Sequence, residues 1–273
     1  MQTLHGEANA QPDPVALFAS DIHLRPSLPV TTGAFFAFLK QAVRARQLYL
    51  LGDLFEYWAG DDDIATPYNR LVVDAIRALS DSGTQVFWIA GNRDFLVGSA
   101  FAEASGAILL PDPSIIDVAG RRIVITHGDA QCTDDAPYMA FRAQVRQPAW
   151  QAQFLAMPLA QRKAIIEGLR KDSKMEQKEK TVAIMDVNPG AIATLFADSG
   201  TMLMVHGHTH RPALHRYPQG QQRYVLPDWD CESEPARGGW LAIYGNGDIV
   251  RHALDGSALV DEQGIYPHTL THP

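Results

Sequence analysis

Residues 205–212 read Val-His-Gly-His-Thr-His-Arg-Pro and place three histidines within five residues. They follow the apolar run 202–205, which suits a buried strand, and Gly207 favours a tight turn after it. Imidazole nitrogens are common metal ligands, so this stretch indicates a metal site. A His-rich surface loop and imidazoles paired with carboxylates are the alternatives, and the other strand ends of the chain decide between them.

Four other apolar segments also end in residues that bind metals. The segment 15–19 is followed by Asp21 and His23, which leave the same side of an extended backbone. The other three end in Gly52-Asp53, in Gly91-Asn92-Arg93-Asp94 and in His127-Gly128-Asp129. Open α/β sheets hold their ligands at the carboxyl ends of the strands. Five such endings, which we expect at the same edge of one sheet, favour a ligand site over coincidence.

The candidate ligands are carboxylate, amide and imidazole groups, namely Asp21, His23, Asp53, Asn92, His127, His208 and His210. Seven ligands are too many for one tetrahedral zinc ion and suit two divalent ions. The oxygen-rich set favours Mn²⁺. Two ions about 3.5 to 4 Å apart share a bridging carboxylate and activate a water for attack on phosphorus. We expect Asp53 to be the bridge because it follows a central strand, and His206 to have a structural role.

The elements that position these residues follow from the hydrophobic pattern. Strands are expected at 15–19, 48–51, 85–90 and 202–205, with a hairpin at 115–118 and 122–126. Helices are expected after a cap at Thr31 or Thr32, and near 67–79, 97–105 and 189–197. The alternating segments 213–217, 223–226, 239–244 and 248–252 are expected to form antiparallel strands of a second sheet.

Residues 132–187 differ in composition and are expected to form a helical cap inserted between two strands. Pro158 suits the first position of a helix whose apolar stripe is Leu159, Ile165, Ile166 and Leu169. Residues 161–180 carry seven basic and four acidic residues, although the whole chain has a net charge of −8. A solvated helix face is the simpler explanation, whereas a cap that approaches a phosphorylated ligand is favoured by its position between ligand-bearing strands.

The acidic trio 61–63 is expected to be a solvated loop, since it lacks EF-hand spacing.

Length and composition favour an α/β (α+β) protein with one catalytic core. In 273 residues we expect a flexible extension at 1–13, a core of 14–131 and 188–253, the cap at 132–187 and a C-terminal tail at 254–273. The acidic balance disfavours nucleic acid as a partner, and no obligate protein partner is indicated. Cys132 and Cys231 lack CxxC spacing, which favours a reducing compartment over a disulfide framework. No run of eighteen apolar residues or secretion signal occurs, so we expect neither secretion nor a membrane span.

The order and spacing of the five ligand motifs resemble the calcineurin-like metallophosphoesterase superfamily, over about residues 15–252. The resemblance implies a double β-sandwich flanked by helices. It also implies one ion held by Asp21, His23, Asp53 and His210, and a second held by Asp53, Asn92, His127 and His208.

This chain has Arg93 where most members of that superfamily have a histidine that protonates the leaving group. A guanidinium cannot release a proton near neutral pH. A phosphate leaving group, with a second pKa of about 6, needs no proton, so a pyrophosphate substrate is favoured. Arg93 would hold phosphate oxygens and offset the charge of the transition state.

Several segments together resemble one branch, the UDP-2,3-diacylglucosamine hydrolases of lipid A biosynthesis: Gly52-Asp53-Leu54-Phe55-Glu56, Gly60-Asp61-Asp62-Asp63, Arg93, Asp172-Ser173-Lys174 and Ile184-Met185-Asp186-Val187-Asn188. The resemblance implies attack at the α-phosphate, giving UMP and 2,3-diacylglucosamine 1-phosphate (lipid X), by a peripheral protein on the cytoplasmic face of the inner membrane. It implies catalytic roles for Asp53, Asn92 and Arg93, and substrate contacts from Asn92, Arg93, Asp135, Ser173, Gln177, Lys180 and His208. Gln177 stands where the branch commonly has Asn.

Two other functions are alternatives. A soluble nucleotide pyrophosphatase or phosphodiesterase of the same superfamily would act on water-soluble dinucleotides without detergent. A metallophosphoesterase fold used as a protein-binding scaffold requires lost ligands, and every ligand position is filled here.

Overall fold

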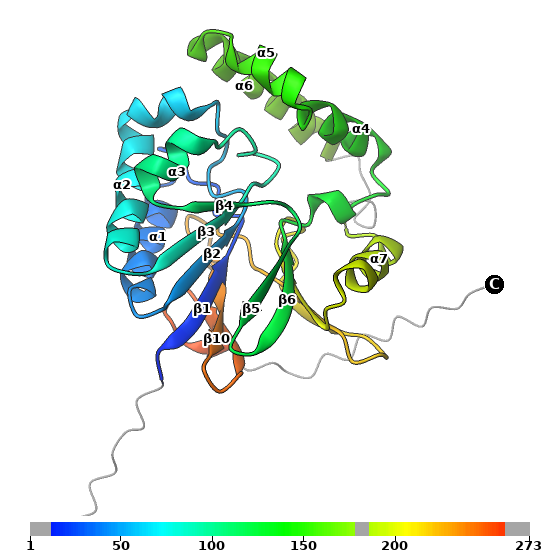
Figure 1. The fold of residues 1–273 in the computed structure, drawn as a ribbon. Helices are drawn as coiled ribbons and strands as arrows, with labels where there is room; N and C mark the ends of the chain where they lie inside the picture. Colours follow the sequence, from blue (N-terminus) through cyan, green and yellow to red (C-terminus); the bar gives the residue numbers. More distant parts are fainter. Residues whose placement is uncertain (1–11, 178–185, 260–273) are drawn as a thin grey trace, which may run out of the picture.

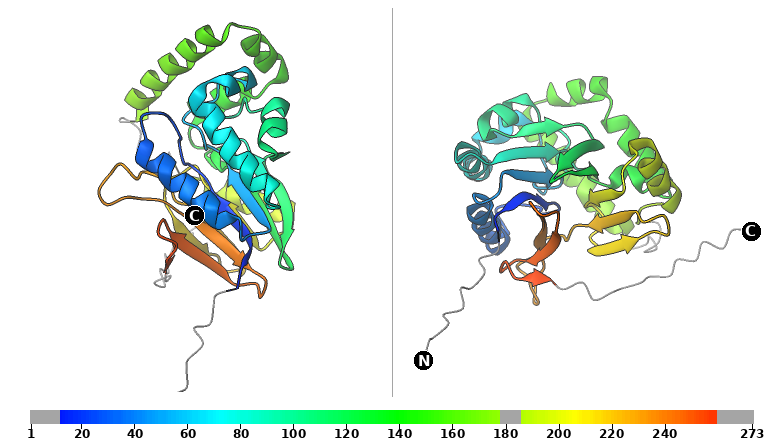
Figure 2. Two further views of the ribbon diagram at one scale, coloured as in Figure 1. Left: turned by 90° about the vertical axis from the view of Figure 1, so that its left-hand side faces the viewer. Right: turned by 60° about the horizontal axis from the view of Figure 1, so that its bottom comes forward.

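The computed structural model describes residues 12–177 and 186–259, without the side chains of 171–177. Two β-sheets pack face to face, and helices cover their outer faces (Figures 1 and 2). This arrangement confirms the predicted double β-sandwich flanked by helices. The strands run so that the carboxyl ends of β1, β2, β3, β6 and β7 meet beneath α4, α5 and α6 (Figure 1).

The first sheet has seven strands in the order β12-β11-β10-β1-β2-β3-β4. Its parallel part consists of β1 (Pro14–Ala19), β2 (Gln47–Leu51), β3 (Gln85–Ile89) and β4 (Ile108–Leu110). Its antiparallel part consists of β10 (Gly239–Tyr244), β11 (Ile249–Ala253) and β12 (Ala258–Leu259). The strand β12 therefore lies within the stretch that we expected to be a tail.

The second sheet has five strands in the order β5-β6-β7-β9-β8. The predicted hairpin is present as β5 (Ser114–Val118) and β6 (Arg121–Thr126), and the strand before the histidines is β7 (Leu203–His206). The sheet is completed by β9 (Gln222–Val225), which is parallel to β7, and by β8 (Ala213–Arg216).

Helices α1 (Pro29–Ala42), α2 (Pro67–Asp81) and α3 (Ser99–Ser105) cover the first sheet, and α7 (Pro189–Ser199) covers the second. Between β6 and β7 the chain forms α4 (Ala136–Val145), α5 (Pro148–Leu155) and α6 (Leu159–Gln177). Two short 3₁₀ turns, η1 (Asp61–Ala65) and η2 (Asp129–Gln131), lie in the loops after β2 and β6.

Strand β1 shows why the central segments are apolar at every position. Leu17 and Ala19 face the core beneath the helices, whereas Ala16 and Phe18 face the core between the two sheets. Phe18 stacks on Tyr49 with ring centroids 4.9 Å apart. A strand buried on both faces has no solvent-facing positions, so its sequence reads as a continuous apolar run.

The prediction that the four alternating segments after residue 212 form one second sheet is wrong. Only β8 and β9 belong to it, whereas β10 and β11 extend the first sheet beside β1. All six residues of β10 are buried, because helices cover one face of this strand and the second sheet covers the other. The strand β10 belongs to the first sheet because it pairs with β1. The alternation of side chains along a segment does not show which strand it pairs with.

The predicted cap of α1 at Thr31 or Thr32 is also wrong. The helix begins at Pro29, and its N-cap residue, Leu28, makes no side-chain hydrogen bond. Proline suits the first helical position because its missing N–H would have no partner there. Thr32 Oγ1 instead donates to the carbonyl oxygen of Leu28 at 2.7 Å.

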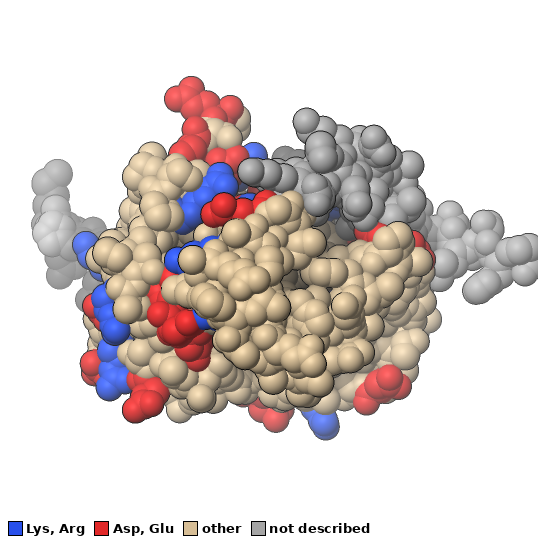
Figure 3. Space-filling view, turned by 90° about the horizontal axis from the view of Figure 1, so that it is seen from above, with Lys and Arg blue, Asp and Glu red and all other residues tan. Residues whose placement is uncertain are grey.

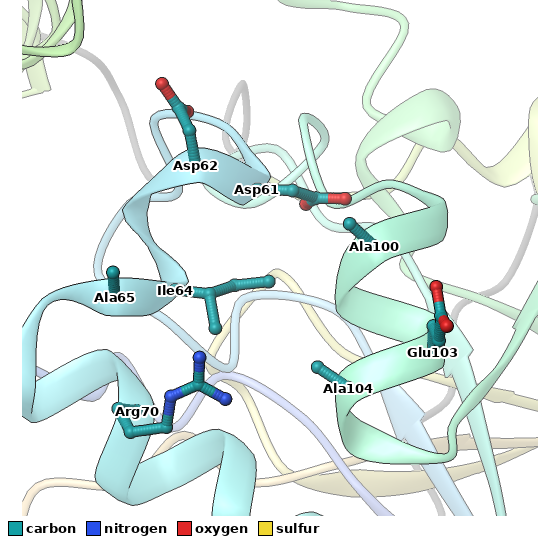
Figure 4. Close-up of a pocket in the computed structure, with 8 residues that line it drawn as sticks. All are labelled: Asp61, Asp62, Ile64, Ala65, Arg70, Ala100, Glu103 and Ala104. Atoms are coloured by element: carbon teal, nitrogen blue, oxygen red, sulfur yellow. The ribbon is translucent and has the colours of Figure 1, made fainter.

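The acidic trio is not the solvated loop that we expected. Asp61 accepts hydrogen bonds from the backbone N–H groups of Gly98 and Phe101, each at 3.0 Å, and so holds the start of α3. Asp63 is buried and pairs with Lys163 at 2.6 Å. Only Asp62 is exposed, and it pairs with Arg162 of α6. Figure 4 shows Asp61 directed toward α3 and Asp62 directed away from it, at the rim of a groove between η1, α2 and α3.

Candidate active site

The five ligand-bearing segments meet at one place but come from two sheets. Strands β1, β2 and β3 lead to Asp21, Asp53 and Asn92 in the first sheet, and β6 and β7 lead to His127 and His208 in the second. The expectation of a single sheet edge is therefore wrong. Because β6 and β7 are parallel to each other, their carboxyl ends lie side by side and face those of the first sheet (Figure 1).

The backbone at the site is strained. Six non-glycine residues of the described chain have a positive φ angle, and five of them are predicted ligands: Asp21 (54°), His23 (54°), Asp53 (53°), His208 (68°) and His210 (54°). The left-handed region is sparsely populated by such residues and costs of order 1 to 3 kcal/mol each. Strain concentrated on these five residues supports a functional role for this cluster.

Two glycines allow the ligand loops to approach closely. A Cβ atom on Gly91 would clash with the Asp53 carboxylate, and one on Gly207 would clash with Asp21 and Ser20. Because glycine has no side chain, its backbone can lie directly against a candidate ligand residue of another loop. His208 N–H then donates to Asp21 Oδ2 at 2.9 Å, which joins the last ligand turn to the first.

One half of the site gathers Asp21, His23 and His210. Their ligand atoms lie within 4.8 Å of one another. His23 Nε2 is 3.2 Å from His210 Nε2, which is 3.4 Å from Asp21 Oδ1. Two imidazole nitrogens and a carboxylate oxygen that point at one another suit a shared cation.

The other half gathers Asn92, His127 and His208. Asn92 Oδ1 lies 2.9 Å from both His127 Nε2 and His208 Nδ1. His127 Nδ1 donates to the Leu51 carbonyl at 2.8 Å, which leaves Nε2 available as a ligand. Asp53 Oδ1 is 3.7 Å from His127 Nε2, and Asp21, Asp53 and His127 form a second group of converging atoms. Asp53 thus lies where it can contact both halves.

The donor set fits divalent cations. Asp21 Oδ1 is buried and has no hydrogen-bond partner in the part of the chain that the structure describes. A buried carboxylate oxygen without a partner is costly unless a cation or a proton compensates it. The set combines carboxylate, amide and imidazole groups without thiolate, which matches non-thiophilic metals.

The charges of the site influence one another strongly. Burial raises the pKa of Asp53 to about 6. Burial alone would also raise the pKa of Asp21, but the nearby imidazoles of His210, His127 and His23 hold it well below its usual range. Burial opposes the charged form of His127, yet the carboxylates of Asp53 and Asp21 raise its pKa to about 9.

Known proteins share these features. The model of the calcineurin-like phosphoesterase family matches residues 15–212, from β1 to the end of the His-rich turn. The chain belongs to this family. It is 52% identical to a UDP-2,3-diacylglucosamine hydrolase of Aromatoleum aromaticum, over 78% of this chain and 89% of that protein.

Proteins of the same name from other organisms are also similar to this phosphoesterase. One of Stenotrophomonas maltophilia is 47% identical over 82% of this chain and 96% of its own length. One of Escherichia coli O81 is 47% identical over 79% of this chain and 91% of its own length.

The remaining predicted substrate contacts are only partly described. Arg93 lies beside the ligands, since its backbone N–H donates to Asp53 Oδ1 at 2.8 Å and its Nε is 3.4 Å from Asp53 Oδ2. Asp135 is buried and caps α4 by accepting from the Tyr138 N–H at 3.2 Å. Ser173 and Gln177 lie on α6, but their side chains, and Lys180 as a whole, fall outside the described residues.

Sequence reasoning named Asp94 at a strand end without giving it a role, and it missed Tyr138. Asp94 is fully buried and accepts from the backbone N–H groups of Gly91 and Leu54, at 2.8 and 2.9 Å, so it ties two ligand loops together. Tyr138 stacks on His208, with ring centroids 6.1 Å apart. Asp94 follows two candidate residues directly, which was the available signal. Nothing in the sequence pattern singles out Tyr138.

His206 has the structural place that we expected. It is fully buried on β7, and its two ring nitrogens lie 2.8 Å from the Gly207 carbonyl oxygen and from Arg223 Nη1. Both nitrogens are thus engaged away from the ligand cluster.

Proposed function

We propose that this phosphoesterase hydrolyses the diphosphate bond of UDP-2,3-diacylglucosamine to UMP and 2,3-diacylglucosamine 1-phosphate. The observation that carries the proposal is the position of Arg93 against Asp53, in the midst of the ligand set. A guanidinium there binds phosphate oxygens but cannot protonate a leaving group. The names of relatives that are 52% and 47% identical to this chain support the same substrate.

Two Mn²⁺ ions are the cofactor that we propose. Asp21, His23, Asp53 and His210 would hold one ion, and Asp53, Asn92, His127 and His208 the other. When bound, the two ions supply an activated water and offset charge on the phosphate oxygens. The protein itself would orient the substrate. Arg93 would hold the α-phosphate in place and stabilise the negative charge that develops on it.

The substrate places the enzyme at a membrane surface, and we propose that it is peripheral on the cytoplasmic face of the inner membrane. No helix among the described residues is long and apolar enough to cross a bilayer. Viewed from above, the side of α4 and α5 carries a broad area without charged side chains (Figure 3). Large apolar side chains are exposed on these helices, namely Phe141 of α4, Leu155 of α5, and Ile165 and Leu169 of α6. Co-sedimentation with phospholipid vesicles tests the placement, and a protein that stays entirely in the supernatant contradicts it.

The activity is tested by incubating the full chain with UDP-2,3-diacylglucosamine and Mn²⁺ and measuring UMP. Release of UMP is expected, and Asp53→Ala should abolish it because both ions lose a ligand. No release by metal-loaded protein would refute the proposal. Equal turnover of water-soluble dinucleotides, without dependence on detergent, would instead indicate a soluble nucleotide pyrophosphatase.

A further inference from the structure

Three arginines converge on one carboxylate oxygen beside the ligand cluster. Glu56 Oε1 is 3.5 Å from Arg25 Nη1 and 3.2 Å from Arg93 Nη1, and it also pairs with Arg170 Nη2. The arginines come from the loops after β1 and β3 and from α6, so the group joins the core to the helices above it. We call Glu56, Arg25, Arg93 and Arg170 the arginine cluster.

The charges of the arginine cluster do not balance. Glu56 is buried and supplies one negative charge against three guanidinium cations. Among the described side chains, these arginines pair with one other carboxylate, that of Asp53, which is 3.4 Å from Arg93 Nε and belongs to the ligand set. The imidazole of His23, 3.8 Å from Glu56 Oε2, adds no negative charge. An excess of partly desolvated cations is unfavourable unless an anion joins them.

Hydrogen-bonding capacity also remains unused. Arg25 Nε and Arg170 Nε are buried and have no acceptor among the described residues. Burial, together with the charge of Arg25, lowers the pKa of Arg170, as expected for crowded cations. The side chains are still accessible, with exposed fractions of 38% for Arg25, 27% for Arg93 and 22% for Arg170. Arg170 is also held over the ring of Tyr57, 5.8 Å from its centroid.

We propose that Arg25 and Arg170, held on Glu56, form with Arg93 an anion subsite that binds phosphate oxygens of a diphosphate lying across the ligand cluster. A planar guanidinium binds phosphate through two parallel N–H donors, and Glu56 occupies such donors until the phosphate arrives. The identity of the anion rests on the proposed function, whereas the subsite rests on the cluster itself.

A purely structural network is the competing explanation. The same ion pairs would then only hold α6 against the loop after β2. Removing an arginine would lower the melting temperature and leave anion affinity unchanged. The subsite makes the opposite prediction for Arg25, which is partly exposed and lies in a loop, so its loss should affect affinity far more than folding.

The test is calorimetric titration of the Mn²⁺-loaded full chain with α,β-methylene-UDP, a diphosphate that the enzyme cannot cleave. Arg25→Gln and Arg170→Gln should each weaken binding by about tenfold to a hundredfold, as for loss of one charge-assisted contact. Arg25→Lys should lose less affinity than Arg25→Gln because it keeps the positive charge. Arg44→Gln is the matched control, since Arg44 pairs with one carboxylate, Asp13, directly before the start of β1 and so at the opposite end of that strand from the site.

Unchanged affinity in both Arg25→Gln and Arg170→Gln would overturn the subsite, and so would a wild-type protein that does not bind the analogue. If Arg170→Gln fails to fold, the affinity of Arg25→Gln for the analogue still tests the subsite. If these variants lose affinity while the wild-type protein releases no UMP from UDP-2,3-diacylglucosamine, the subsite stands and the proposed function fails.

Discussion

His127 shows how the fold orients a single candidate ligand. It is fully buried, and its Nδ1–H is fixed on the Leu51 carbonyl, so its Nε2 points at Asn92 and Asp53. Without a cation, the carboxylates around it favour the imidazolium and raise its pKa to about 9, despite burial. Metal and proton therefore compete for the same nitrogen.

We predict that Mn²⁺ binding releases protons and weakens as the pH falls below about 9, because His127 is protonated in the metal-free protein at neutral pH and must lose its proton to bind. Titration calorimetry at pH 7.5 in two buffers with different ionisation enthalpies measures the release. Heats that do not depend on the buffer would contradict this prediction.

Arg93 is predicted to act on the transition state. Arg93→Ala should retain both metals but lower kcat by about a hundredfold to a thousandfold, the usual effect of removing one donor to developing charge. Arg93→Lys should recover only part of the activity, because the ammonium lacks the planar fork. UMP release and metal content are measured on the same samples, and full activity in Arg93→Ala would exclude the role.

At the scale of residues, the sequence indicated which side chains converge at the site, because each follows an apolar strand. Asp21, Asp53 and Asn92 lie at strand ends where any parallel sheet collects its ligands. Glu56, Arg25 and Arg170 come together from three separate elements, and no local spacing reports such a contact. The sequence therefore predicts the centre of the site better than its surroundings.

At the scale of elements, α4 is tied directly to the ligand loops. Asp129, two residues after His127, accepts from Tyr138 Oη at 2.6 Å and from Arg142 Nε at 2.8 Å. Arg146 Nη2 donates to the Gly91 carbonyl at 2.9 Å, next to Asn92. Displacement of α4 would thus disturb the ligand geometry.

Asp129→Asn is predicted to lower the free energy of unfolding at pH 7 by about 3 kcal/mol, since it breaks a buried ion pair. Burial opposes ionisation of Asp129, but His127 and Arg142 hold its pKa below its usual range. A depressed pKa contributes stability above the unfolded pKa, about 3.9, and this contribution is lost as the pH falls further.

The measurement for Asp129 is urea unfolding of the wild-type protein and the variant at pH 7 and below pH 4. The difference between them should shrink at the lower pH. Asp117→Asn, at an exposed position of β5, is the control and should change little. A difference that stays constant with pH would show that the charge of Asp129 contributes nothing.

Helices and strands were predictable wherever their periodicity was strong, but their partners were not. The segment Gly239–Tyr244 pairs with Pro14–Ala19, more than two hundred residues earlier in the chain. Side-chain alternation indicates a strand without naming its neighbour. The start of α1 was misplaced for a different reason, because Pro29 replaces a side-chain cap.

At the scale of the whole molecule, two sheets bring two ligand sets together and a helical segment lies over them. The first sheet supplies carboxylate and amide oxygens and the imidazole of His23, and the second supplies imidazoles from the loops after β6 and β7. The helical segment adds Arg170 toward the site and leaves apolar side chains exposed on α4 to α6. This division suits a substrate with a charged diphosphate and a lipid part.

The position of attack tests the central claim most directly. We predict that hydrolysis of UDP-2,3-diacylglucosamine in oxygen-18 water places the label in UMP and none in 2,3-diacylglucosamine 1-phosphate, because the proposed function places the α-phosphate against Arg93 and the ligand cluster. Mass spectrometry of both products after a single turnover shows which product carries the oxygen-18 label. Label in the sugar phosphate would contradict the account.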